Sequence, residues 1–77
     1  MIEVILYTRA GCRLCDEAKQ VLRDAGVAFA ELDIDADLEL RARYNEEVPV
    51  VFIGGRKAFK YHVDPLELAR RLKALAT

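Results

Sequence analysis

Residues 2–16 read Ile-Glu-Val-Ile-Leu-Tyr-Thr-Arg-Ala-Gly-Cys-Arg-Leu-Cys-Asp, and this stretch decides the fold. Its first part, residues 2–7, is a short apolar run rich in β-branched residues, which is typical of a buried strand. The apolar residues of the segment 14–25 then recur at helical spacing. The stretch therefore predicts a strand that leads into a helix, with Cys12 and Cys15 at the start of the helix.

A second, shorter helix is predicted in the middle of the chain. Asp35 or Asp37 is placed to cap it, and Leu38 and Ala42 are expected to face inward. Asn45 tolerates the left-handed conformation, so we expect it to end this helix.

Three further strands are predicted, over residues 27–33, 48–53 and 56–61. Gly54-Gly55 separates the last two of them. Because both glycines accept positive φ without steric cost, this pair predicts a hairpin turn.

The last helix is predicted to begin after Asp64, an N-cap residue that is followed by proline at the first helical position. Leu68, Leu72 and Leu75 are expected to face inward. The element order is therefore β-α-β-α-β-β-α. Because a β-α-β unit joins parallel strands and a hairpin adds antiparallel ones, we expect one α/β domain over residues 1–77, a four-stranded mixed sheet flanked by three helices.

The composition narrows the class of protein. The 77 residues carry 12 basic and 13 acidic side chains. This near-balance argues against a nucleic-acid or membrane-surface partner, which would show as a basic excess. The opening segment is too short and too charged for a signal peptide or a membrane span. We therefore expect a cytoplasmic, monomeric protein.

Cys12 and Cys15 are the only two cysteines. The first turn of a helix holds such a pair close enough to bond, and its unpaired N–H groups favour a thiolate at the leading position. A structural disulfide across so short a loop removes little entropy from the unfolded state, and so stabilises the fold by only about 2 kcal/mol. Redox chemistry is therefore favoured over a structural role, and the two thiols carry the electrons without a cofactor.

Two alternatives stay open at this point. A structural zinc needs four ligands, and His62 is the only histidine, so a metal site would need a dimer that shares two C-x-x-C pairs around zinc or an iron–sulfur cluster. The second alternative is a redox-inactive adaptor that uses its fold only for binding. It stays open because a fold alone does not establish a function.

The C-x-x-C pair at a helix start, Val48-Pro49 at the opening of the third strand and the element order together resemble a glutaredoxin, the minimal thioredoxin fold. The resemblance spans essentially the whole chain, and residues 6–18 are similar to small bacterial glutaredoxin-like proteins whose site reads G-C-x-L-C. It implies a dithiol thiol–disulfide oxidoreductase that reduces protein disulfides or glutathione mixed disulfides, with a part in electron transport and cell redox homeostasis. The electron donor would be glutathione or a flavin-dependent reductase.

The resemblance also implies a role for individual residues. Cys12 would attack a substrate disulfide as a thiolate, and Cys15 would resolve the mixed disulfide. Pro49 is expected to be cis, which would bring Val48 beside the attacking sulfur, where the Val48 backbone pairs with an extended peptide or with glutathione. Arg9 is placed to hold a substrate carboxylate.

Two departures from the family pattern concern the substrate. Arg13-Leu14 replaces the Pro-Tyr pair common between glutaredoxin cysteines, and we expect Arg13 and Leu14 to contact the substrate. Tyr61-His62-Val63 stands where glutaredoxins usually have Gly-Gly, the place at which glutathione closely approaches the backbone. With bulky side chains there, a disulfide-containing protein or another small thiol is an open alternative to glutathione.

Overall fold

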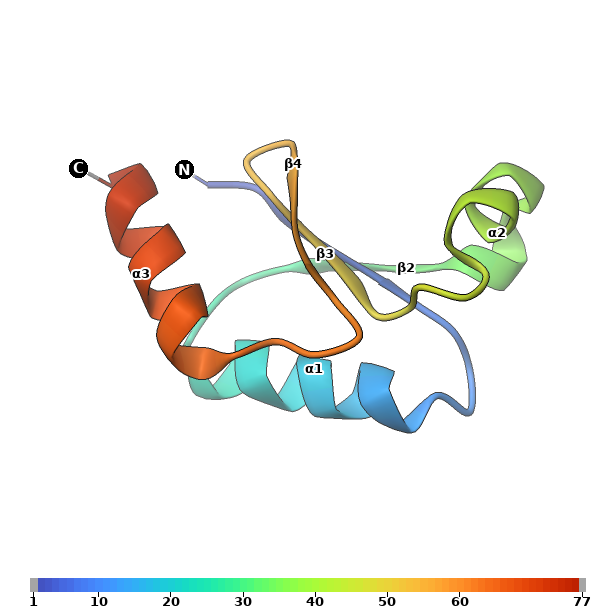
Figure 1. Ribbon diagram of the computed structural model, residues 1–77, viewed down its shortest axis with the longest axis horizontal. Helices are drawn as coiled ribbons and strands as arrows, with labels where there is room; N and C mark the ends of the chain where they lie inside the picture. Colours follow the sequence, from blue (N-terminus) through green and yellow to red (C-terminus); the bar gives the residue numbers. More distant parts are fainter. Residues whose placement is uncertain (1, 77) are drawn as a thin grey trace.

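Strand β1 (Val4–Thr8) lies inside a four-stranded sheet with the order β2-β1-β3-β4 (Figure 1). It pairs in parallel with β2 (Ala30–Asp33) and antiparallel with β3 (Val50–Ile53), which turns back into β4 (Arg56–Lys60). The computed structural model describes residues 2–76 of the chain. The predicted mixed sheet is confirmed.

The three predicted α-helices also form. Helix α1 (Arg13–Asp24) follows β1, and Gly26 has a φ of 72° just beyond its end, as expected of a left-handed cap. A short 3-10 helix, η1 (Ile34–Ala36), precedes α2 (Leu38–Tyr44), and α3 (Pro65–Ala76) closes the chain.

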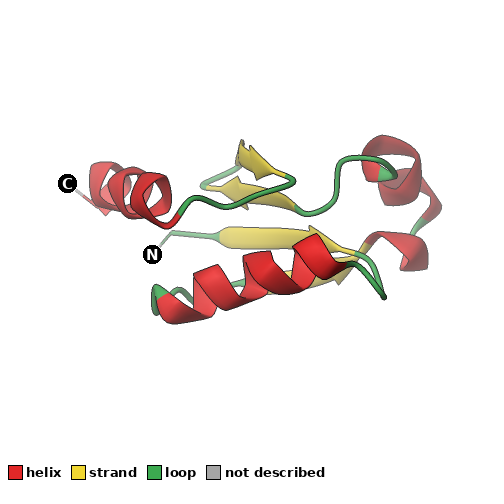
Figure 2. Cartoon of the chain, turned by 60° about the horizontal axis from the view of Figure 1, so that its bottom comes forward, coloured by secondary structure: helices red, strands yellow, loops and turns green. Residues whose placement is uncertain are grey.

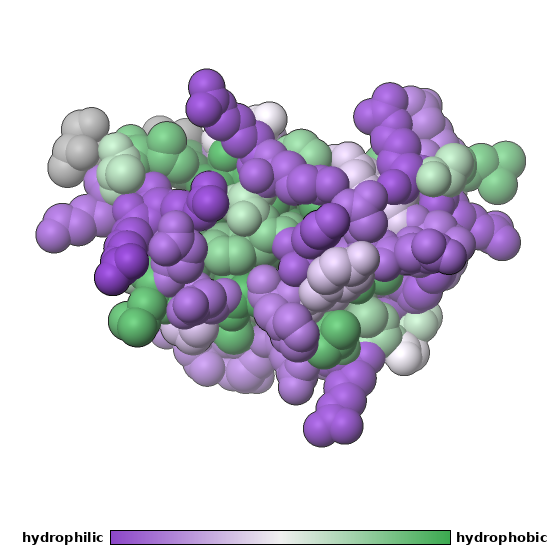
Figure 3. Space-filling view, in the orientation of Figure 1, coloured by the Kyte–Doolittle hydropathy of each residue, from purple (hydrophilic) through white to green (hydrophobic). Residues whose placement is uncertain are grey.

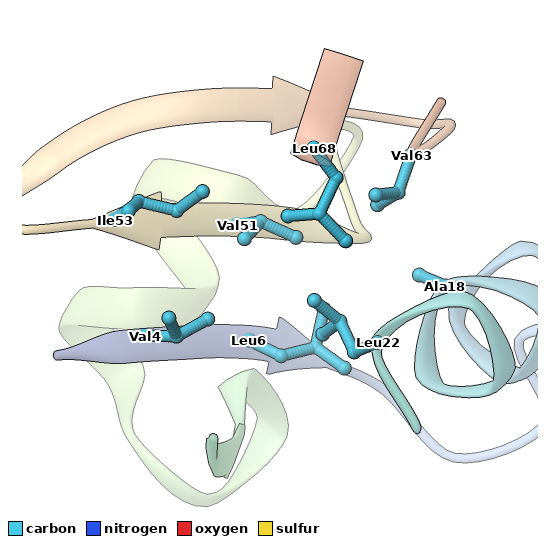
Figure 4. Packing of buried hydrophobic residues seen from close by; sticks show 8 residues of the cluster. All are labelled: Val4, Leu6, Ala18, Leu22, Val51, Ile53, Val63 and Leu68. Atoms are coloured by element: carbon cyan, nitrogen blue, oxygen red, sulfur yellow. The ribbon is translucent and has the colours of Figure 1, made fainter. Parts of the chain in front are cut away.

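The helices cover both faces of the sheet because alternate strand side chains point to opposite sides. Figure 4 shows the larger cluster, in which strand residues such as Leu6 meet Leu22 of α1 and Leu68 of α3, all three fully buried. On the other face, Val50 packs against Ile34 and the Tyr44 ring. Helices α1 and α3 thus lie on one side, and α2 stands at one end of the sheet (Figures 1 and 2).

Strand β2 is shorter than the predicted segment 27–33. Val27 and Phe29 precede the strand and pack against the larger cluster instead of pairing with β1. Their apolar character therefore serves packing rather than strand formation, which the sequence pattern alone does not distinguish.

The prediction that Leu38 and Ala42 face inward is wrong, because both are exposed, Leu38 by 80%. Asp37 caps α2 by accepting hydrogen bonds from two of its backbone N–H groups, so the helix starts at Leu38. Leu40 and Tyr44 form the inward stripe of α2, and the Tyr44 ring stacks on an aromatic ring of β1 at a centroid distance of 4.8 Å.

Two smaller expectations are also wrong. Asn45 does not adopt the left-handed conformation, since its φ is −48° and its ψ −39°. Leu75 is 52% exposed, because the last turn of α3 lies beside the Gly54 turn, outside the buried cluster.

Polar side chains frame the face viewed in Figure 1, with apolar surface exposed in its middle (Figure 3). Within residues 2–76, none of the helices has the length and apolar character needed to cross a membrane.

The correction to α2 yields a matched pair of variants. Leu40→Ala removes apolar contacts with the sheet and should lower the free energy of unfolding by about 1–2 kcal/mol, less than for a fully buried leucine. Leu38→Ala changes an exposed position on the same helix and should stay within about 0.5 kcal/mol of the parent chain. Urea denaturation of both variants checks this, and equal losses would contradict the observed helix face.

Candidate active site

Ends of all four strands meet at one edge of the sheet. Thr8 lies opposite Asp33, Tyr7 opposite Val50, and Val50 opposite Lys60. Strands β1, β2 and β4 therefore end at this edge, and β3 begins there. The segments just outside these ends carry the candidate site residues.

Cys12 and Cys15 form a disulfide, with 5.2 Å between their Cα atoms. Cys12 is the N-cap of α1 and half-buried, and its Sγ accepts a hydrogen bond from the backbone N–H of Cys15 at 3.1 Å. Cys15 is fully buried. The two sulfurs thus differ in access, since an incoming reagent reaches Cys12 first.

The helix start also favours negative charge on the Cys12 sulfur. The first N–H groups of a helix have no intrahelical acceptor, and they carry the positive end of the helix dipole. The Cys15 N–H is one of these groups and already points at the sulfur. Once the disulfide is reduced, the local backbone geometry therefore favours a thiolate at Cys12.

The Val48-Pro49 peptide bond is cis, as predicted. Pro49 is fully buried, Val48 is half-buried, and the Pro49 carbonyl accepts a hydrogen bond from the Tyr61 N–H at 2.9 Å. Pro49 immediately precedes β3 and so lies at the edge that also carries the cysteines. That the Val48 backbone pairs with a substrate stays a prediction.

Arg9 lies in a hydrogen-bonded network. Its Nε and Nη2 donate to the two carboxylate oxygens of Asp35 at 3.0 and 2.9 Å. Nη1 and Nη2 also donate to the backbone oxygen and Oδ1 of Asn45 at 2.9 and 2.7 Å. Four of the five guanidinium N–H groups are thereby engaged. The hydrogen bonds from Arg9 hold the pKa of Asp35 below its ordinary value, so the carboxylate is charged at neutral pH.

Arg13 and Leu14 occupy the first turn of α1, between the cysteines. Arg13 is exposed and Leu14 is half-buried. Their contact with a substrate stays a prediction.

Tyr61 has a backbone conformation that was not predicted from the sequence. Its φ is 68°, a left-handed value that is unusual for a bulky residue. The His62 N–H donates to the Lys60 carbonyl at 2.8 Å, so Tyr61 is the central residue of a tight γ-turn. The side chain is 40% exposed, and the Lys60 ammonium lies 5.5 Å from the ring centroid.

A second ion pair braces the segment before the cis bond. Glu47 accepts a hydrogen bond from the Lys57 ammonium at 2.7 Å, and this bond lowers the pKa of Glu47. Lys57 also lies over the Tyr44 ring at 5.8 Å from its centroid. Glu47 is thus engaged within the chain, although it stands next to Val48.

The partners of Arg9 and Glu47 were missed because they are distant in sequence. From the sequence, Asp35 was predicted only as a possible helix cap, and Asn45 only as the end of the same helix. In the described part of the chain, no three His, Cys, Asp or Glu side chains gather as metal ligands.

Comparisons with known proteins agree with this geometry. The Glutaredoxin-like domain (DUF836) family matches residues 3–73, which include both cysteines and the cis-proline. A glutaredoxin of Pseudomonas aeruginosa is 41% identical over 59 residues, covering 70% of this chain and 70% of that protein. The X-ray structure of protein XcR50 from X. campestris has a TM-score of 0.82 at 36% identity, over 92% of this chain and 96% of that one.

A further relative is much longer. The hybrid peroxiredoxin hyPrx5 of Haemophilus influenzae is 39% identical over 57 residues, covering 69% of this chain. The match spans 24% of the length of that protein, so the similarity concerns one part of it.

Proposed function

The chain belongs to the glutaredoxin-like family, and from this membership we propose that it is a dithiol oxidoreductase that reduces disulfide bonds of protein substrates. The observation that carries the proposal is the difference in burial of the bonded pair. Cys12 is half-buried at a helix start, and Cys15 is fully buried one turn further along. An attacking sulfur must be accessible, whereas a resolving sulfur needs access only to its neighbour.

The reaction divides between the two sulfurs. The Cys12 thiolate attacks one sulfur of the substrate disulfide, forms a mixed disulfide and releases the other sulfur as a thiolate that takes up a proton. Cys15 then loses its proton and attacks the Cys12 sulfur. The second substrate thiol leaves, two electrons have passed to the substrate, and the Cys12–Cys15 disulfide seen in the structure is the product.

A reductant must return two electrons to this disulfide before the next cycle. Two molecules of glutathione or a flavin-dependent reductase are the candidate donors. Either restores both thiols without a cofactor bound to this chain, because the pair itself stores the electrons.

Tyr61 supports a protein substrate over glutathione. It begins the segment that replaces the Gly-Gly pair of glutaredoxins, and its exposed ring occupies space that a glycine would leave open. A surface groove of about 430 Å³ runs between the loop after α2 and Tyr61, on the flank of the segment that leads to Pro49. A polypeptide bound along the segment before Pro49 would extend into this groove.

Trapping the intermediate tests the assignment of the two sulfurs. In Cys15→Ser the mixed disulfide cannot be resolved, so a disulfide-containing protein such as oxidised insulin should accumulate as a covalent adduct at Cys12. Cys12→Ser should give no adduct above background, because its remaining thiol is buried. Non-reducing mass spectrometry reads both results. Adducts of equal yield in the two variants would contradict the division of roles.

Replacing Tyr61 tests substrate choice. Tyr61→Gly places at a φ of 68° the residue that accepts this conformation without a Cβ penalty, so the fold should tolerate it. We expect the rate of glutathione adduct formation on a Cys15→Ser background to rise about tenfold, equivalent to roughly 1.4 kcal/mol. Tyr61→Phe keeps the ring and serves as the control. Equal rates in the Gly and Phe variants would show that the ring does not exclude glutathione.

A further inference from the structure

We propose that Arg9 is a positioning residue for disulfide exchange: it holds the loop that carries Cys12 against the segment that leads to the cis-proline. The inference rests on the proposed function and adds to it a residue that acts through others. It differs from the role of substrate-carboxylate ligand that the family resemblance implies for Arg9.

Three segments of the chain converge on the Arg9 guanidinium. Arg9 directly follows β1 and stands three residues before Cys12. Asp35 belongs to η1, just after β2, and Asn45 follows α2 and stands four residues before Pro49. The four hydrogen bonds of Arg9 therefore tie the attacking cysteine's loop, the end of β2 and the approach to the cis-proline together at one point.

The network is itself braced. The Asp35 N–H donates to the Asp33 side chain at 2.8 Å, which fixes the backbone of η1. Arg41 approaches the Asp35 carboxylate from α2, with its Nε 3.7 Å from Oδ1. Asp35 thus meets two cations from different segments, and its two oxygens are directed at the Arg9 fork.

The geometry requires an arginine and not only a positive charge. The planar guanidinium presents donors in several fixed directions, so it bonds both Asp35 oxygens and both Asn45 oxygens at once. A lysine offers one nitrogen and cannot span these acceptors. Arg9→Lys therefore keeps the charge and removes the bracing, which separates the two contributions.

This network affects the chemistry by aligning Cys12 with the segment along which the substrate lies. Exchange needs the substrate sulfur in line with Cys12 while the rest of the substrate lies along the Val48-Pro49 segment, and small misplacements of reacting groups are costly in rate. With one guanidinium N–H left, Arg9 is poorly equipped to bind a substrate carboxylate as well.

The test measures the second-order rate constant of the reduced protein with two matched disulfides. N-acetylcysteine amide disulfide has no carboxylate, and N-acetylcysteine disulfide has one on each half. We expect Arg9→Lys and Asp35→Asn each to slow both reactions by about fivefold, and the double variant to be no slower than either single variant, because the same contact is removed. Arg70→Lys, at an exposed ion pair on α3, is the matched control and should react at the parent rate.

A second readout separates alignment from thiolate charge. Alkylation of Cys12 by iodoacetamide needs the thiolate and not the cis-proline segment, so its rate should be unchanged in all these variants. All rates are measured at a temperature at which circular dichroism shows every variant to be folded.

Four results would overturn the proposal. Slowing limited to the carboxylate-bearing disulfide would make Arg9 a substrate ligand, and parallel slowing of alkylation would assign it an electrostatic effect on Cys12. A lower Tm with unchanged exchange rates would leave only a structural ion pair. Failure of the parent protein to react with either disulfide would remove the proposed function first, and with it this inference.

Discussion

The parallel pairing of β1 with β2 is the constraint on which the position of the site depends. Parallel neighbours need a crossover connection, and α1 provides it, so this helix must begin at the edge of the sheet where β1 ends. Because β3 is antiparallel to β1, it begins at the same edge, with Pro49 in front of it. The topology therefore places the helix N-terminus that carries Cys12 and the cis-proline at the same edge of the sheet.

The sequence signals that were correct are local ones. The apolar stripe of α1, Gly26 beyond its end and the Gly54-Gly55 hairpin follow from residues that are near one another in the chain, and all are present in the structure. The inward face of α2 was assigned wrongly because a seven-residue helix offers two plausible stripes. Only the aromatic packing around Tyr44, which brings together three segments, selects between them.

Some residues of the candidate site could likewise be predicted from the sequence, and others could not. Cys12 and Cys15 were recognisable because their spacing at a helix start is a local pattern, and Pro49 was recognised through the resemblance to glutaredoxins. The partners of Arg9 were not, since Asp35 and Asn45 lie 26 and 36 residues away, and a single sequence carries no signal that links them. The positive φ of Tyr61 was likewise hidden, because it arises from the γ-turn at the end of β4 and from its hydrogen bond to Pro49.

The central claim is that Cys12 and Cys15 cycle as one two-electron pair. The most direct measurement is the intact mass of the protein across a series of reduced-to-oxidised glutathione ratios. The account predicts loss of two hydrogens in a single transition, with a midpoint in the range of about −200 to −270 mV that is typical of glutaredoxins and thioredoxins. Thiols that stay reduced at every ratio would contradict it and bring the metal-binding or adaptor alternatives forward.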